Sequence, residues 1–127
     1  MPLSYQIDKQ YNILACKVSG VLSVDEVRKF RADLRVDELF SNRLNLLFDM
    51  HEATDFDISS AEFREIAADS PMSKTSKRAY VASSEVVYGQ LRIFAGHSLA
   101  DPDYFRVFRD LAEARRWLGL DADVDPA

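Results

Sequence analysis

The chain has 127 residues, of which 47% are hydrophobic and 29% are charged, and its formal net charge is -5. This composition indicates one globular domain that folds without disulfides or a structural metal, and it excludes wholesale disorder. The negative charge argues against nucleic acid and anionic membrane surfaces as partners, because both repel an acidic chain. We expect a cytoplasmic protein for three reasons. There is a single cysteine, no secretion leader is visible, and no apolar run is long enough to span a membrane.

The N-terminal part predicts a β-hairpin followed by a helix. Residues 5–7 and 14–18 each alternate apolar and polar side chains, and the polar letters "DKQ" lie between them. Cys16 lies in the second of these stretches, so we expect a small buried core residue. Ser23 and Glu26 have the spacing of a capping box, which predicts that a helix begins there.

A central strand and a second helix come next. The nearly continuous apolar run "LNLLFDM", Leu44–Met50, is typical of a strand that is buried on both faces of a largely parallel sheet. Ser59 and Glu62 repeat the capping-box spacing, and Pro71 lies where the second helix must have ended.

The second half of the chain continues the alternation of strands and helices. "RAYVAS", Arg78–Ser83, predicts a strand, and "SEVVYGQLRIFAG" predicts a helix. Gly89 inside that helix costs up to about 1 kcal/mol relative to alanine, so we expect something to pack closely against it. "YFRVFRD" predicts the last strand, and a final helix begins at Asp110 and stops at Gly119.

This order of elements predicts the fold class. A hairpin followed by alternating helices and strands indicates an α/β fold with a mostly parallel five-stranded sheet and about four helices. We expect one domain over residues 1–120 and a short acidic tail over residues 121–127.

Several of these segments together resemble a known family. They are "LNLLFDM" followed by a serine-capped helix, "VVYGQLRIF" in the third helix, and the ending "FRVFRDLAEARRWLGL". The pattern resembles the STAS-like family often called SpoIIAA-like, whose fold is also likened to the CRAL-TRIO lipid-transfer domain. The resemblance covers residues 4–120 and implies a STAS-like fold, and none of its motifs is a catalytic signature.

The resemblance also implies a regulatory role for two serines. In anti-sigma-factor antagonists, a partner kinase phosphorylates a serine in an Asp-Ser-Ser-Gly-like turn before the second helix. The matching stretch here is "DISSA", which makes Ser59 and Ser60 the phosphoacceptor candidates, although Ile58 and Ala61 depart from that pattern. A helix N-terminus tolerates a phosphate, whereas the acidic residues before it oppose one. Simple helix capping is the alternative, and it requires no regulatory function.

The stretch "DMHEATDFD" ahead of the second helix predicts an acidic loop that another protein would bind. The candidate residues of this partner-binding surface are Asp49, His51, Glu52, Asp55 and Asp57. A calcium loop counted from Asp55 lacks the glycine and the glutamate that such a loop needs, so we expect no metal and no cofactor.

The aromatic residues suggest an alternative function. They make up 11% of the chain and are frequent in its second half, where a pocket between sheet and helices would bind a small apolar ligand or lipid, as the CRAL-TRIO likeness also implies. The simpler interpretation is that the rings fill the core. The ligand-pocket candidates are Tyr80, Tyr88, Gly89, Phe94 and Phe105.

An enzyme is the least supported class of function. The sequence has two histidines, and it contains no nucleophile-elbow motif, no glycine-rich phosphate loop and no Cys-x-x-Cys pair. We therefore expect no catalytic residue. The sequence favours a regulatory module that binds another protein, with ligand binding as the alternative and a homodimer as a further hypothesis.

Overall fold

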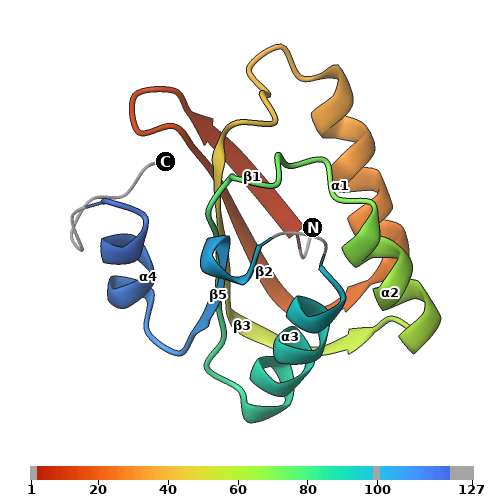
Figure 1. The fold of residues 1–127 in the computed structure, drawn as a ribbon. Coiled ribbons are helices and arrows are strands. Elements are labelled where there is room, and N and C mark those ends of the chain that lie inside the picture. The colour runs from red at the N-terminus through yellow and green to blue at the C-terminus, as the bar shows by residue number, and fades with distance from the viewer. Residues whose placement is uncertain (1–2, 99–100, 121–127) are drawn as a thin grey trace.

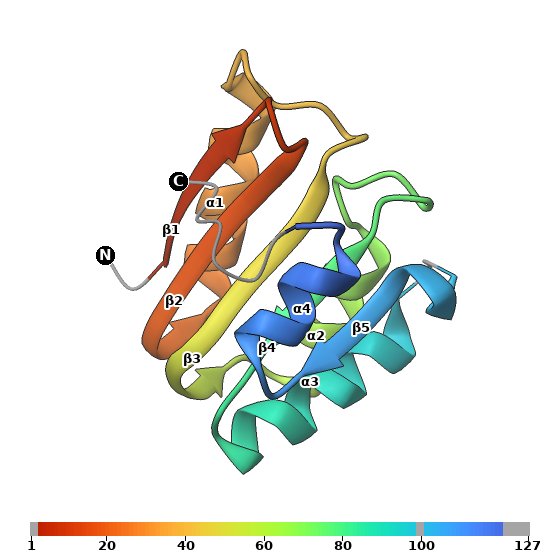
Figure 2. The same cartoon turned by 90° about the vertical axis from the view of Figure 1, so that its left-hand side faces the viewer.

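One sheet with helices on both faces forms the molecule. In chain order the elements are β1 (Leu3–Asp8), β2 (Ile13–Ser23), α1 (Val24–Val36), β3 (Asn45–Asp57), α2 (Ser60–Ala68), β4 (Arg78–Val81), α3 (Glu85–His97), the 3-10 turn η1 (Pro102–Tyr104), β5 (Phe105–Phe108) and α4 (Leu111–Trp117). The computed structural model describes residues 3–98 and 101–120. Figure 1 and Figure 2 show α1, α2 and α3 on one face of the sheet and α4 on the other.

The sheet is mixed and mostly parallel. Strands β1 to β5 lie side by side in chain order; β1 and β2 form an antiparallel hairpin, and β2 to β5 run parallel to one another. Together with the four α-helices of the described residues, this arrangement confirms the predicted fold class. The acidic tail predicted over residues 121–127 lies outside the described residues. No helix in the described ranges is long and apolar enough to cross a membrane.

The alternation of side chains along the strands creates two cores. In the central strand β3, Phe48 and Met50 face α1, α2 and α3 and belong to the larger core, whereas Leu47 faces α4 and belongs to the smaller one. The apolar run that predicted a strand covered on both faces is therefore confirmed. Cys16 is buried in the larger core, also as predicted.

Each helix begins at a side chain that caps it. Ser23 and Ser59 each accept a hydrogen bond from the backbone N–H of the glutamate three residues later, and the carboxylate of that glutamate accepts one from the serine N–H. Both predicted capping boxes are thus present. Ser84 and Asp110 provide side-chain caps for α3 and α4.

Strand β3 is longer than the sequence predicts. The acidic stretch expected as a loop continues the strand to Asp57 and pairs with the second half of β2, where Ser19 lies opposite Glu52. Gly20, with φ +68°, adopts the left-handed conformation at a register shift in this ladder. Within β3, only Leu46–Asp49 pair with β4. The rest of β3 has β2 as its neighbour but no β4 on its other side, so its charged side chains can face solvent.

Candidate functional site

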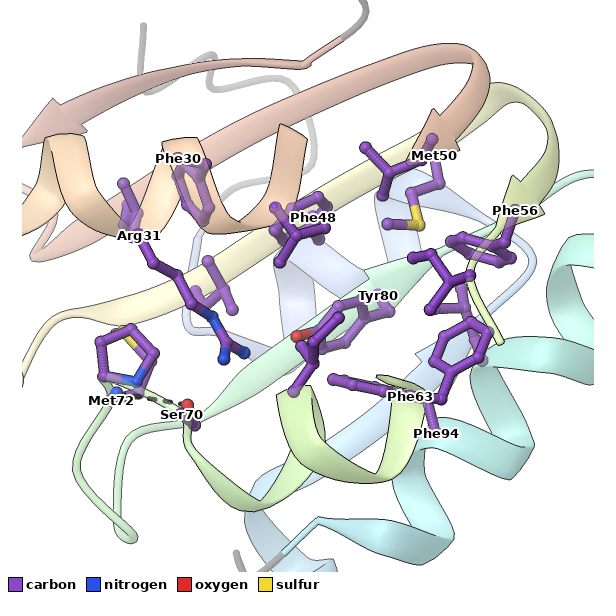
Figure 3. Close-up of a pocket in the computed structure, with 18 of the residues that line it drawn as sticks. Phe30, Arg31, Phe48, Met50, Phe56, Phe63, Ser70, Met72, Tyr80 and Phe94 are labelled. Carbon is purple, nitrogen blue, oxygen red and sulfur yellow. Dashed lines mark hydrogen bonds between the residues drawn. The ribbon is translucent and has the colours of Figure 1, made fainter. Parts of the chain in front are cut away.

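An apolar cavity lies between the sheet and the helices α1, α2 and α3. Its volume is about 60 Å³, and side chains from β2, β3, β4 and all three helices form its wall. Apart from Arg31, Ser70 and the hydroxyl of Tyr80, these side chains are apolar. Figure 3 shows how the larger ones converge on the cavity. They are Phe30, Phe48, Met50, Phe56, Phe63 and Phe94.

Aromatic rings form a row along this wall. The rings of Phe48 and Tyr80 stack with centroids 5.3 Å apart, and those of Tyr80 and Phe105 stack at 4.9 Å. Phe94 contacts Tyr80 edge-on at 5.9 Å. Phe48 and Tyr80 lie opposite each other on neighbouring strands, whose spacing of about 4.8 Å holds their rings face to face. Phe105 lies opposite Arg78 and therefore reaches the Tyr80 ring diagonally across the ladder between β4 and β5. Such pairs stabilise a core by about 0.5–1.5 kcal/mol each beyond their burial, so this wall is firm.

One end of the cavity is polar. Figure 3 shows the guanidinium group of Arg31 and the hydroxyl of Tyr80 pointing toward each other. Arg31 Nη1 donates a hydrogen bond of 2.8 Å to the carbonyl oxygen of Asp69, the last residue of α2's C-terminal turn. The Tyr80 hydroxyl forms no hydrogen bond within the described part of the chain. Burial raises the pKa of Tyr80 to about 12, and the charges of Arg31 and Arg78 act in the opposite direction.

Arg78, next to Tyr80 on the same face of β4, is a buried charge. Its side chain is 3% exposed, and its Nη2 donates to the carbonyl oxygens of Met72 at 3.2 Å and Ser73 at 2.8 Å. Its Nε and Nη1 atoms have no partner among the described residues. Unpaired buried donors cost about 1–3 kcal/mol each. Burial lowers the pKa of Arg78, and neither Arg78 nor Arg31 forms an ion pair with a carboxylate of residues 3–98 or 101–120.

Some ligand-pocket candidates line this cavity. Tyr80 and Phe94 belong to its wall, and Phe105 lies behind Tyr80, against which it stacks. The sequence analysis did not single out Phe30 and Phe63, which the structure places in the cavity wall. The sequence contained one sign of a polar group beside the cavity: Arg78 begins the strand "RAYV". All four residues of this strand are buried.

Two other ligand-pocket candidates lie elsewhere on α3. Tyr88 is half-buried at the margin of the core, and the guanidinium carbon of Arg109 lies 4.1 Å from its ring centroid. Gly89 is exposed, and a Cβ atom at this position would meet nothing within 4 Å. The expectation that something packs closely against Gly89 is therefore wrong.

The candidates for a partner-binding surface lie along the outer part of β3. Asp49 is buried; it accepts a hydrogen bond of 3.1 Å from the backbone N–H of His51, and its Oδ1 lies 2.7 Å from the ring Nδ1 of His51. Asp49, His51 and Glu52 line one polar depression, whereas Asp55 and Asp57 are exposed farther along the strand. A protein partner would therefore meet the exposed side chains before it met Asp49.

The two phosphoacceptor candidates differ in their surroundings. The Ser59 side chain accepts a hydrogen bond of 3.1 Å from the backbone N–H of Glu62, and the Ser59 N–H donates to the Glu62 carboxylate at 2.9 Å. This backbone hydrogen bond lowers the pKa of Glu62. Ser60 is the exposed first residue of α2, and its hydroxyl has no hydrogen-bond partner within residues 3–98 and 101–120. Capping by Ser59 is confirmed, and phosphorylation stays a prediction.

Metal and thiol chemistry find little support in the geometry. In the described ranges, no three His, Cys, Asp or Glu side chains come together in a group that could hold a metal ion. The thiol of Cys16 is buried, and burial raises its pKa well above the ordinary value. A thiol of this kind is a poor nucleophile.

A family model and a solved structure are similar to this chain. A family model described as SpoIIAA-like matches residues 13–119. The fold is similar to the crystal structure of an uncharacterized protein with a SpoIIAA-like fold from Shewanella loihica PV-4. The two chains are 16% identical, the TM-score is 0.61, and the match covers 91% of this chain and 93% of the other. No curated protein is similar enough in sequence to match.

Proposed function

Because this chain belongs to the SpoIIAA-like family, whose model matches residues 13–119, we propose that it is a non-enzymatic module that works by binding. Its principal ligand is a small apolar molecule that enters the cavity beneath α1, α2 and α3. The observation that carries this proposal is a cavity with an almost entirely apolar wall at the centre of the larger core. Binding sites for small molecules are typically concave and apolar, with few polar groups.

The cavity in this structure is too small for a whole ligand. Its volume of about 60 Å³ is well below the roughly 150 Å³ of an engineered apolar cavity that binds benzene in another protein. Binding therefore requires part of the wall to move. Helices α1 and α2 pack against each other less closely than α2 and α3 do, so the seam between α1 and α2 is the part of the wall that opens.

The test uses an uncharged apolar probe, 1-decanol, together with native mass spectrometry of the purified protein. We expect either a retained apolar molecule in the spectrum or an increase in melting temperature with decanol. A ligand present at 100 times its Kd stabilises the folded state by about 2.7 kcal/mol. The proposal fails if the spectrum shows an empty protein whose melting temperature is indifferent to decanol.

A protein partner that binds the outer half of β3 and the start of α2 is the second candidate. Two observations favour it: Glu52, Asp55 and Asp57 are exposed, and Ser60 lies exposed at a helix N-terminus, where a phosphate is tolerated. A regulatory partner would sense the charge that phosphorylation adds there.

The phosphorylation hypothesis is tested with Ser60→Asp, with Ser60→Ala as the matched control. We expect Ser60→Asp to change which proteins are captured from native lysate, while both variants keep the melting temperature of the unmodified protein. Phosphopeptide mass spectrometry should find phosphate on Ser60. Unmodified serine under every growth condition, together with identical capture by both variants, contradicts the hypothesis.

A further inference from the structure

The donors at the polar end of the cavity lack an acceptor. The Tyr80 hydroxyl lies at the cavity wall (Figure 3) and makes no hydrogen bond to the described residues. The buried Nε and Nη1 atoms of the adjoining Arg78 have no hydrogen-bond partner among those residues. Arg78 does not line the cavity, but it is hydrogen-bonded to the backbone of Met72, which does. A hydrogen-bond acceptor that enters here would find the Tyr80 hydroxyl and the Arg31 guanidinium group in the cavity wall.

The same end of the cavity is electrically positive. Arg31 and Arg78 lie close enough for their charges to affect one another. Burial lowers the pKa of Arg31, Tyr80 and Asp69 raise it, and the charges of Arg35 and Arg78 lower it. Neither Arg31 nor Arg78 has a carboxylate in ion-pair contact among residues 3–98 and 101–120. Within an apolar wall the local dielectric is low, so a single negative charge is attracted strongly.

Arg31 also lies where a ligand would enter. Together with Val27 and Ile66 it lines both the inner cavity and a groove on the outside of α1 and α2. The hydrogen bond from Arg31 to the Asp69 carbonyl is one polar link across this seam. A second link is the ion pair between Arg28 and Glu65, at 3.7 Å, and its solvent exposure makes it weak.

We infer that the ligand is a single-chain amphiphile of the fatty-acid type, whose carboxylate is bound by Arg31 and Tyr80 while its tail lies in the cavity. Arg78 adds positive charge from the adjoining wall. The carboxylate replaces the Asp69 carbonyl as the acceptor of the Arg31 guanidinium, so the contact that closes the seam becomes the contact that holds the ligand. A carboxylate fits because it accepts hydrogen bonds from both oxygens and donates none. This inference rests on the apolar-ligand function proposed above.

The first experiment compares three ten-carbon probes with the same tail by isothermal titration calorimetry at pH 7, below the concentrations at which they aggregate. The probes are decanoate, 1-decanol and decyltrimethylammonium. We expect decanoate to bind at least about tenfold more tightly than decanol, a difference of about 1.4 kcal/mol, and the cationic probe not to bind. Equal affinity for decanoate and decanol would overturn the carboxylate inference and leave the apolar-ligand function standing.

The second experiment compares Arg31→Met with Arg28→Met, since both arginines lie on α1 and link it to α2. Arg31→Met should weaken decanoate binding about tenfold and leave decanol binding unchanged or improved, because only the head-group contact is lost. Arg28→Met should leave both affinities unchanged. An equal loss of decanoate affinity in the two variants would contradict the inference, because it would mean that Arg31 only links α1 to α2 and does not bind the carboxylate. If no probe binds the unmodified protein and none raises its melting temperature, the proposed function and this inference fail together.

Discussion

Replacing Ile66 by phenylalanine should stabilise the protein by filling the cavity. Ile66 lies on α2 with 7% of its surface exposed, and it lines the cavity wall. Empty cavity volume costs about 24 cal/mol per Å³, so a cavity of about 60 Å³ leaves about 1.4 kcal/mol to be recovered at most. One larger side chain will recover only part of it. We expect a gain of about 0.5–1 kcal/mol and a rise in melting temperature of about 2–5 °C.

The assay is urea denaturation of Ile66→Phe beside a matched control, Ile93→Phe. Ile93 lies on α3 and is 61% exposed, so the same substitution there should change the free energy of unfolding by less than about 0.5 kcal/mol. The filled variant should also lose its affinity for decanol. A loss of more than about 1 kcal/mol in Ile66→Phe, with Ile93→Phe unchanged, would refute the reasoning, since it would mean that the larger ring is overpacked and no usable space exists there.

Three further predictions concern other parts of the fold. Ser59→Ala should lower the free energy of unfolding by about 1 kcal/mol in urea denaturation, whereas Ser60→Ala should lower it by less than about 0.3 kcal/mol, because only Ser59 caps α2; equal effects would contradict the assigned cap. The Tyr5 hydroxyl donates a hydrogen bond of 2.7 Å to the Asp37 carboxylate. Burial and this hydrogen bond raise the pKa of Tyr5 to about 12, and the same hydrogen bond lowers the pKa of Asp37. The lowered pKa of Asp37 stabilises the folded state at a pH above the pKa that Asp37 has in the unfolded chain, and this stability is lost as the pH falls through its pKa in the folded protein. The raised pKa of Tyr5 stabilises the folded state at neutral pH, and this stability is lost as the pH rises through about 12. The stability difference between the unmodified protein and Tyr5→Phe should therefore be largest near pH 7 and shrink at pH 3; a difference that is constant with pH would exclude this linkage. Cys16, buried and with a raised pKa, should resist a thiol reagent at pH 8 until urea unfolds the chain, and rapid labelling of the native protein would contradict its burial.

Parts of the candidate site could be read from the sequence, and other parts could not. Tyr80 and Phe94 were identified because aromatic residues are frequent in the second half of the chain, and the structure places both in the cavity wall. Arg31 was not, because its helix position gives no sign that the guanidinium turns inward to reach α2. Tyr88 was named for the same reason, but the frequency of aromatic residues does not distinguish a cavity wall from the margin of a core, where Tyr88 lies.

The sequence by itself determined the order of the elements, the helix starts at Ser23 and Ser59, and the central position of β3, because these depend on local hydrogen bonds and on the apolar pattern within short segments. Tertiary structure alone decided that β3 continues through an acidic stretch to Asp57, since that depends on a ladder with β2 rather than on local propensity. It also decided that Arg31 and Tyr80, distant in sequence, meet at one end of the cavity (Figure 3). Such contacts between distant residues depend on how α1 packs against the sheet, and no pattern within a single segment predicts them.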